Sequence, residues 1–312
     1  MADTVWTIAR LLAWTTDFFR EHGIENPRLD AEVLLGAVLG KDRMYLYVHF
    51  DEPLEPAELA AFRSHVKERA AHMPLAYVLG TREFMGLDFC VTRDTLIPRP
   101  DTELLVQCAV DFLRAHAGEG HTDLAFADIG TGTGAIALSV LHYTEGTRAD
   151  AVDISPAAAE VARENAARLG LAERIEVHVG DLTAPLAGHS YDVILSNPPY
   201  IPTADIATLM PEVRSYEPHL ALDGGRDGLT LYRRLAADAP ALLRDGGMLA
   251  VEVGIDEAHD VARLLENNAR IVRTEIQKDL AGIERVVVGY KNDTILYVRS
   301  EAFAWSSHGK EL

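Results

Sequence analysis

The chain has 312 residues, more than one typical hydrophobic core needs, which predicts two domains. Its formal net charge of −19 argues against a partner bound mainly through phosphates, so direct nucleic-acid binding is not expected. The sequence has neither a long apolar run nor a basic, apolar start. These absences argue against a membrane span and a signal peptide and predict a cytoplasmic location.

Cysteine and histidine usage gives no sign of a metal site. Cys90 and Cys108 match neither a metal-ligand spacing nor a disulfide framework, so free thiols in a reducing compartment are expected. The twelve histidines include no H-E-x-x-H pair. We therefore expect no bound metal.

The N-terminal quarter of the chain has the apolar spacing of helices. Asn26-Pro27 and Gly40 interrupt the pattern, as is typical of helix ends. No set of titratable residues stands out here, which favours a role in recognition or packing. The residues expected at helical spacing on the apolar faces are Val5, Ile8, Leu11, Leu12, Phe18, Phe19, Leu29, Val33, Leu34, Ala37, Val38, Leu59, Phe62 and Val66.

A short hairpin and a proline-rich segment follow this helical region. Residues 80–91 alternate between apolar and polar side chains, which predicts the hairpin. Asp101 is a natural N-cap for a helix that runs through Leu104 and Val110. Arg99 lies at the expected interdomain seam, where a functional role and a structural ion pair both remain open.

Residues 124–129 read as a buried strand that leads into Gly130-Thr131-Gly132-Thr133-Gly134, and residues 135–140 open a helix. Strand, glycine turn and helix form the nucleotide-binding entry of a doubly wound sheet. The glycines permit positive φ and carry no Cβ, so a ligand can lie against the backbone. The run also fits the G-x-G-x-x-[GA] pattern, but this is weak evidence for NAD because several cofactor classes use the same turn.

Acidic residues follow the next two predicted strands. The first of these two strands ends at Asp153, at the position where ribose hydroxyls are usually held. Helix capping, the other role for this acid, is already supplied by Ser155-Pro156. The next strand, residues 174–179, is followed by Asp181 and Leu182. We expect Asp181 to hold an adenine amino group, while Leu182 packs either on the adenine ring or in the core.

The strand over residues 191–196 ends in Asn197-Pro198-Pro199-Tyr200. Because proline lacks the N–H that a strand ladder needs, the backbone carbonyls around it are left without strand partners. With the Asn197 amide they form a rigid set of acceptors that suits a planar NH2 group, with Tyr200 against its plane. The alternative is a double-proline turn that only closes the strand. It is disfavoured because the glycine turn and both acids also follow strand ends, where open α/β sheets bind ligands.

The C-terminal third of the chain predicts the rest of the sheet. A long irregular stretch, residues 201–226, is expected to cover the substrate. A helix over residues 229–243 follows, and Glu252 in the next strand either faces the pocket or is a buried structural acid. The last three strands, which complete a seven-stranded sheet with its final strand antiparallel, are expected over residues 248–253, 271–276 and 285–290.

These residues resemble the class I S-adenosylmethionine-dependent methyltransferases that modify a planar amide or amine nitrogen. Residues 25–290 are similar to the release factor glutamine N5-methyltransferases, the HemK/PrmC family. The segment Ile97-Pro98-Arg99-Pro100-Asp101-Thr102-Glu103 is the most specific, because many methyltransferases share the glycine loop and the Asn-Pro-Pro-Tyr run. The other resembling segments are Pro74-Leu75-Ala76-Tyr77-Val78-Leu79-Gly80 and Glu83-Phe84-Met85-Gly86-Leu87.

The resemblance implies an α/β fold, a Rossmann-like class I methyltransferase seven-stranded sheet with an N-terminal all-helical domain. It implies a helical substrate-recognition domain over residues 1–79, a hairpin linker over residues 80–95 and a methyltransferase domain over residues 96–290. The family gives no role to the C-terminal extension, residues 291–312. In that extension Ile295-Leu296-Tyr297-Val298 either adds a strand or is disordered.

The family also implies the cofactor, S-adenosylmethionine, and the residues around it. Asp128 is the acid near the methionine amino group, unless it only ends its strand. Asp153 holds the ribose. The substrate is the glutamine of the Gly-Gly-Gln loop of class I peptide chain release factors. The residues expected to bind the cofactor are Gly130, Thr131, Gly132, Thr133, Gly134, Asp153, Asp181, Leu182 and Asn197.

Amide chemistry determines the expected mechanism. An amide nitrogen is a poor nucleophile, so the sulfonium supplies the activation and the protein aligns nitrogen, methyl carbon and sulfur. The Asn197 side-chain oxygen and the Pro198 carbonyl accept the two N–H bonds, which favours positive charge developing on the nitrogen. Pro199 and Tyr200 complete the substrate site, and Tyr200 packs on the amide plane. No strong general base is evident.

Three other functions compete with this one. Methyl transfer to an exocyclic amine of a nucleobase needs the same acceptor geometry, but the acidic balance and the N-terminal half disfavour it. A nicotinamide-dependent oxidoreductase leaves the Asn-Pro-Pro-Tyr run without a purpose. A catalytically silent scaffold conflicts with the intact glycine loop, acid and acceptor run.

Overall fold

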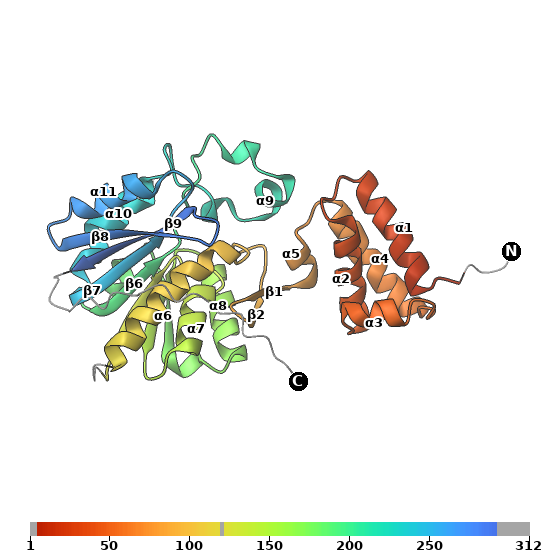
Figure 1. Ribbon diagram of the computed structural model, residues 1–312, viewed down its shortest axis with the longest axis horizontal. Coiled ribbons are helices and arrows are strands. Elements are labelled where there is room, and N and C mark those ends of the chain that lie inside the picture. The colour runs from red at the N-terminus through yellow and green to blue at the C-terminus, as the bar shows by residue number, and fades with distance from the viewer. Residues whose placement is uncertain (1–4, 119–121, 292–312) are drawn as a thin grey trace.

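The computed structural model describes residues 5–118 and 122–291, which form two groups of elements in Figure 1. One group is a bundle of helices near the N-terminus, and the other is an α/β part with a central sheet. No helix within these described ranges is long and apolar enough to cross a membrane.

The helical part confirms the predicted helices of the N-terminal region. The Thr7 side chain caps the first helix by accepting from the Arg10 N–H, and Gly40 ends the second in the left-handed conformation. The helices enclose one apolar core that includes Leu34, Phe62 and Val66. They are α1 (Ile8–Glu21), α2 (Pro27–Leu39), α3 (Arg43–Val48), α4 (Pro56–Ala70) and α5 (Leu75–Leu79).

The predicted apolar face of this region is wrong at three positions. Leu29 is 41% exposed, Val5 is 62% exposed, and Ala37 is also exposed. Helix α2 instead turns Asp30 and Glu32 inward, where each carboxylate meets arginine side chains. An apolar pattern does not reveal a buried helix face that is built partly from paired charges.

The predicted hairpin is confirmed as β1 (Thr81–Phe84) and β2 (Leu87–Cys90), which pair antiparallel. It is fixed to the α/β part by the fully buried Asn165. The side-chain oxygen of Asn165 accepts from the Cys90 N–H at 2.7 Å, and its amide nitrogen donates to the Cys90 carbonyl at 3.0 Å. The same nitrogen donates to the Thr133 carbonyl of the glycine turn at 2.9 Å. One side chain therefore joins the hairpin to the glycine turn.

The α/β part contains the predicted seven-stranded sheet, in the order β5-β4-β3-β6-β7-β9-β8. Among the seven described strands of this sheet, only β9 runs opposite to the other six, as expected for the last strand. The strands are β3 (Ala125–Ile129), β4 (Arg148–Asp153), β5 (Ile175–Val179), β6 (Tyr191–Ser196), β7 (Leu243–Glu252), β8 (Ile271–Lys278) and β9 (Glu284–Lys291).

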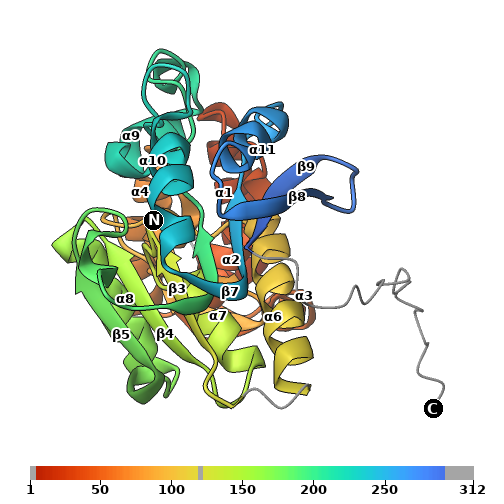
Figure 2. The same ribbon diagram turned by 90° about the vertical axis from the view of Figure 1, so that its left-hand side faces the viewer.

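Helices cover both faces of this sheet, and each face packs in its own apolar core (Figure 2). One face carries α6 (Glu103–Gly118), α7 (Ala135–Tyr143) and α8 (Pro156–Arg168). The other carries α10 (Thr230–Asp238) and α11 (Ala258–Glu266). This layering is the predicted doubly wound α/β architecture, and it leaves the strand ends as the open edge of the sheet.

The predicted N-cap role of Asp101 is wrong. A 3₁₀ turn over Pro100–Thr102 precedes α6 and begins directly after Arg99, so Asp101 lies inside the turn. The Asp101 carboxylate instead lies 2.9 Å from Arg285 Nη2 of β9. Pro100, whose fixed φ suits a first helical position, starts the helical conformation before Asp101 is reached.

Residues 201–226 are less irregular than predicted, because they include α9 (Pro211–Tyr216), which lies next to the helical part. Arg69 of α4, whose side chain is 5% exposed, donates to Asp30 Oδ2 at 2.7 Å and to Glu212 Oε1 of α9 at 2.6 Å. The Tyr216 hydroxyl donates to the Ala71 carbonyl at 2.5 Å. The segment that follows the Asn-Pro-Pro-Tyr run is thus tied to the helical part.

The boundaries expected between domains, at residues 79 and 95, remain predictions. The extension beyond residue 291, including the strand considered at residues 295–298, lies outside the described residues.

We expect Arg69→Met to lower the free energy of unfolding of the helical part by about 3 kcal/mol, because it leaves the buried Asp30 carboxylate without its partner. Glu212→Gln is the matched control. Its carboxylate is 27% exposed, and we expect a loss below about 1 kcal/mol. Urea unfolding followed by fluorescence of Trp6 and Trp14 measures both. Equal, small losses of unfolding free energy in both variants would show that Arg69 does not stabilise the contact between the helical part and α9.

Candidate active site

A pocket of about 400 Å³ opens at the carboxyl ends of the parallel strands. Its walls come from the glycine turn after β3, the ends of β4, β5 and β6, and the segment between the hairpin and α6. Four of the sequence signals are brought together here, namely the glycine turn, Asp153, Asp181-Leu182 and Asn197. The common edge of a parallel sheet explains this convergence.

The glycine turn has the backbone geometry that a bound ligand needs. Gly130 and Gly132 have φ of +78° and +55°, and the space beside the position of a Cβ is open at both. The Gly130 and Thr131 N–H groups donate to the Val152 carbonyl of β4, at 2.8 and 3.0 Å. Both glycines line the pocket, so ligand atoms can approach the backbone directly. Gly134 has a different role, because a Cβ there would lie 3.0 Å from Leu138 of α7.

Asp128 lies under the glycine turn and is fully buried. Its Oδ2 accepts from the Thr131 hydroxyl at 2.6 Å and from the Ala137 N–H of α7 at 3.2 Å. Its Oδ1 has no hydrogen-bond partner among the described residues. Burial raises the pKa of this carboxyl to about 7. Asp128 therefore organises the turn from below and does not line the pocket in this structure.

Asp153 stands at the end of β4 and lines the pocket. Its two oxygens accept from the Gly132 N–H at 2.8 Å and from the Ser155 N–H at 2.9 Å. Burial raises the pKa of this carboxyl, against these backbone hydrogen bonds. Ser155 caps α8 as predicted, so the acid is free of that task. The neighbouring Ile154 is 51% exposed and also lines the pocket, an apolar contribution that sequence reasoning missed.

The end of β5 places Asp181 and Leu182 at the pocket wall. Asp181 Oδ2 accepts from Arg234 Nη2 of α10 at 2.7 Å, an ion pair that the sequence did not suggest. Leu182 has φ of +48°, a conformation that is costly for a leucine and that clusters at binding sites. Leu182 both lines the pocket and packs against the apolar core on the α10–α11 face. The two positions considered for Leu182, against a ligand and in the core, are therefore compatible.

The Asn-Pro-Pro-Tyr run turns out of β6 as predicted, and its members lie at different depths. Asn197 and Pro199 line the pocket, whereas Pro198 is buried and is not among the lining residues. Tyr200 packs against the α10–α11 core and does not line the pocket in this structure. Burial, with the charge of Glu252 nearby, raises the pKa of Tyr200 to about 12. Its hydroxyl therefore stays protonated at neutral pH.

Phe84 of β1 and, before α6, Thr95 and Thr102 also line the pocket, a role that the motif analysis gave to none of them. For Arg99 the sequence left open a functional role or a structural ion pair. In the structure Arg99 lines the pocket and also pairs with the buried Glu217. Glu217 also accepts from the Ile97 N–H at 3.4 Å. The Ile-Pro-Arg-Pro segment is thereby joined to residues 201–226 beside the pocket.

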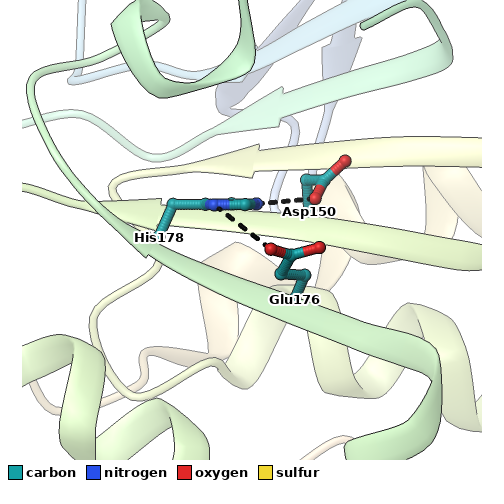
Figure 3. Close-up of side chains that lie close together, drawn as sticks. All are labelled: Asp150, Glu176 and His178. Carbon is teal, nitrogen blue, oxygen red and sulfur yellow. Dashed lines mark hydrogen bonds and ion pairs between the residues drawn. The ribbon is translucent and has the colours of Figure 1, made fainter.

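A second polar group, drawn in Figure 3, involves Asp150 of β4 with Glu176 and His178 of β5. Their potential ligand atoms lie within 4.8 Å of one another, an arrangement that no motif in the sequence indicated. His178 Nε2 lies 2.7 Å from Asp150 Oδ1, and His178 Nδ1 lies 3.8 Å from Glu176 Oε1. Asp150 also accepts from the Tyr191 hydroxyl at 2.7 Å. Burial raises the pKa of Asp150, but the hydrogen bonds outweigh it and the net shift is downward. These contacts account for the group as a hydrogen-bonded network outside the pocket.

The raised pKa of Asp128 predicts a pH-dependent stability. A neutral Asp128 contributes stability that is fully present below pH 3.8 and is lost as the pH rises through about 7. Urea unfolding at pH 5 to 8 should therefore show the wild type losing stability relative to Asp128→Asn, by up to about 1.4 kcal/mol per pH unit.

The control for Asp128 is Asp227→Asn. Hydrogen bonding to Arg233 lowers the pKa of Asp227 to about 2, so its contribution changes only in acid. Its difference from the wild type should stay constant from pH 5 to 8. If the Asp128→Asn difference is equally constant, Asp128 is ionised in the native protein throughout this range.

Family models match both parts of the chain. A model described as the PrmC N-terminal domain matches residues 10–80, and one described as the methyltransferase small domain matches residues 102–212. Among solved structures, the hMettl16 catalytic domain in complex with MAT2A 3'UTR hairpin 6 aligns with a TM-score of 0.56. It covers 74% of this chain and 84% of that chain at 18% identity, so the likeness shows the class I methyltransferase fold alone.

Curated relatives cover nearly the whole chain. A Geobacter sulfurreducens protein named release factor glutamine methyltransferase is 47% identical over 286 residues, 91% of this chain and 97% of that protein. A Moorella thermoacetica protein of the same name is 46% identical over 271 residues, 87% of this chain and 94% of that protein. On this identity and coverage, the chain belongs to the release factor glutamine methyltransferase family.

Proposed function

We propose that this protein transfers a methyl group from S-adenosylmethionine to the side-chain amide nitrogen of the glutamine in the Gly-Gly-Gln loop of class I peptide chain release factors. It is a protein-(glutamine-N5) methyltransferase. The observation that carries the proposal is the position of Asn197, an amide at the wall of a pocket that also contains the glycine turn and Asp153. The relatives' shared name supplies the substrate class.

The residues of the pocket fit S-adenosylmethionine. The open space beside Gly130 and Gly132 receives the methionine end, and the Asp153 carboxylate accepts from the ribose hydroxyls. Asp181, with one oxygen held by Arg234, presents its other oxygen to the adenine amino group, and Ile154 adds apolar contact. When bound, the cofactor supplies an activated methyl group on a positively charged sulfur.

Asn197 and the adjacent carbonyls perform the acceptor side of the reaction. The Asn197 Nδ2 donates to the Thr102 hydroxyl at 3.3 Å, which leaves Asn197 Oδ1 to accept from the substrate NH2 group. The Pro198 carbonyl accepts the second hydrogen. Two acceptors aligned on one nitrogen fix its lone pair toward the methyl donor and stabilise the positive charge that develops there. The proton leaves after methyl transfer without a dedicated base.

The helical part is the surface that docks the release factor. Several large apolar side chains of α1, of α3 and of the residues just after α3 are at least half exposed, namely Trp14, Met44, Tyr47, Val48 and Phe50. Such exposure is typical of interaction surfaces. The Arg69–Glu212 contact ties this part to the segment beside the active site, so docking there positions the Gly-Gly-Gln loop near the pocket. Recognition uses protein contacts and no direct nucleic-acid binding.

A nucleobase amine is the second candidate acceptor, because an exocyclic amine has the same planar NH2 group. The net charge of −19 opposes binding through phosphates. The hMettl16 structure contains an RNA hairpin, but its 18% identity carries only the fold. We therefore prefer the glutamine of a release factor over a nucleobase amine as the methyl acceptor.

Asn197→Ala should abolish most methyl transfer and spare cofactor binding. We expect kcat to fall about 100-fold or more, because one charge-stabilising acceptor is removed. The Kd for S-adenosylmethionine should change far less. Transfer of a labelled methyl group to a purified bacterial class I release factor measures the first quantity, and calorimetry measures the second. Equal losses in both would contradict the acceptor role.

The control for the substrate is the same release factor with its Gly-Gly-Gln glutamine changed to alanine. Label on the wild-type factor alone supports both chemistry and substrate. Binding of the cofactor without labelling of either factor would leave the methyltransferase fold in place and overturn the substrate assignment. Transfer RNA and other proteins are the next acceptors to assay in that case.

Asp153→Asn should weaken cofactor binding by about tenfold to 100-fold, because a charged acceptor for the ribose is lost. Asp150→Asn is the matched control, on the same strand but outside the pocket. It should leave the Kd unchanged. Calorimetric titration with S-adenosylmethionine distinguishes the two variants, and equal Kd values for both would rule out the ribose role.

A further inference from the structure

Glu252 is a buried acid that the proposed function has not used. It is the last residue of β7 and is 3% exposed. Strands β6 and β7 are parallel neighbours, with Ser196 opposite Val251, so the next residues along them, Asn197 and Glu252, lie side by side at the open edge of the sheet. Glu252 Oε2 has no hydrogen-bond partner among the described residues. An ionisable group in this position calls for an explanation, because burying it is costly.

Thr102, Asn197 and Glu252 form one polar cluster. The Asn197 Nδ2 donates to Thr102 Oγ1 at 3.3 Å, and Thr102 is itself buried at 5% exposure. The nearby Thr102 and Asn197 side chains lower the pKa of the Glu252 carboxyl, against the larger raising effect of its burial. The three residues come from the turn before α6, the turn after β6 and the end of β7. Thr102 and Asn197 line the pocket, whereas Glu252 does not.

The direction of the hydrogen bonds in this cluster decides how Asn197 is presented. An asparagine amide has a donor end and an acceptor end of nearly equal size, so its neighbours determine which end faces which way. An ionised carboxylate only accepts, and it therefore attracts Nδ2 and the Thr102 hydroxyl. With Nδ2 held in this way, Oδ1 is the end that remains for the substrate NH2 group.

We propose that Glu252 is a positioning residue that fixes the orientation of the Asn197 amide, with Nδ2 held toward Thr102 and Glu252 and Oδ1 presented to the acceptor nitrogen. The inference rests on the proposed function, because it assigns the same acceptor role to Asn197. It adds that the acceptor site is assembled from three segments and requires a negatively charged carboxylate behind the amide.

The surroundings of Glu252 make this orientation pH-dependent. Burial raises the pKa of Glu252 to about 7, a net value that includes a rise from the Asp101 carboxylate and a lowering by Arg285 of β9. Tyr200 and Tyr232 also face the acid, and the hydroxyl of Tyr232 donates to the Glu252 carbonyl at 2.7 Å. Both tyrosines stay neutral at pH 6 to 8, since burial raises their pKa values. Protonation gives Glu252 a donor, which can face Oδ1, and the amide is then free to turn.

Glu252→Gln is the variant that tests the proposal, because glutamine keeps the shape but adds a donor. We expect its kcat for methyl transfer to a class I release factor to fall about 100-fold, as for a misplaced reacting group. The KM for the release factor and the Kd for S-adenosylmethionine should change by less than about twofold. A merely structural acid would instead lower the unfolding temperature without separating kcat from KM.

Glu257→Gln is the matched control. Glu257 lies five residues further on, where its carboxylate accepts from the Gly254 N–H at 3.1 Å, and it does not line the pocket. We expect this variant to keep kcat within about twofold of the wild type. A loss of kcat in Glu257→Gln as large as in Glu252→Gln would overturn the proposal.

The pH profile provides a second measurement that needs no variant to fold. For the wild type, kcat/KM should rise as the pH increases through a value near 7, and Glu252→Gln should show a flat profile there. A wild-type profile that is flat from pH 6 to 8 would contradict the proposal.

The third measurement uses no methyl transfer. In protein labelled with [15N]asparagine, the side-chain NH2 signals of Asn197, identified by their absence in Asn197→Asp, should shift with pH near 7. The same signals should stay fixed in Glu252→Gln. Signals that do not titrate in the wild type would overturn the proposed orientation.

The two proposals fail in different ways. If the wild type labels no release factor, the proposed substrate is wrong. If the wild type labels the factor and Glu252→Gln matches it in kcat and in pH profile, only the role of Glu252 is wrong.

Discussion

The parallel pairing of β3 with β4 and β6 is the constraint on which the rest of the structure depends. Parallel strands end at the same edge, so three separate turns, each with its own chemistry, are delivered to one place. The glycine turn, Asp153 and Asn197 need no further device to bring them together. The backbone carbonyl of Val152 in β4 also accepts the N–H groups that shape the glycine turn, so the ladder and the turn are continuous.

Buried charges hold together the segments that the sheet does not organise. Arg69 joins the helical part to α9, Arg99 joins the pocket segment to Glu217, and Glu252 lies behind Asn197. Asp30, Glu212 and Glu217 are each paired with an arginine, as the cost of burying a charge requires, whereas Glu252 keeps one oxygen without a partner among the described residues. The contacts Arg69–Glu212, Arg99–Glu217 and Asn197–Thr102 each link residues more than 90 positions apart, and the last two include residues that line the pocket. Charge pairing here sets orientation rather than adding much stability.

The sequence was sufficient for the sheet and its edge, because apolar runs, glycines and prolines have strong local preferences. The seven strands, the antiparallel β9, the hairpin and the cap at Ser155 all followed from local pattern. One error was local, because α10 ends at Asp238 and β7 begins at Leu243, where a helix over residues 229–243 was expected. The other errors arose where side chains act over long distances. Asp101 pairs with Arg285, and α2 turns Asp30 inward to Arg69, neither of which any local rule anticipates. The roles assigned to individual pocket residues remain predictions, since they depend on bound molecules.

The contacts of Asn165 have a consequence for how this protein can be divided. The side chain of Asn165 bonds both to the backbone of Cys90 in the hairpin and to that of Thr133 in the glycine turn. Phe84 and Phe89 of the hairpin also pack in the apolar core on the α6–α8 face of the sheet. A catalytic fragment that started after the hairpin would leave a buried amide half unsatisfied and an apolar surface bare. The hairpin is thus an inseparable piece of the catalytic core rather than a flexible tether. Recombination or truncation that respects the physical unit has to cut on the N-terminal side of residue 80.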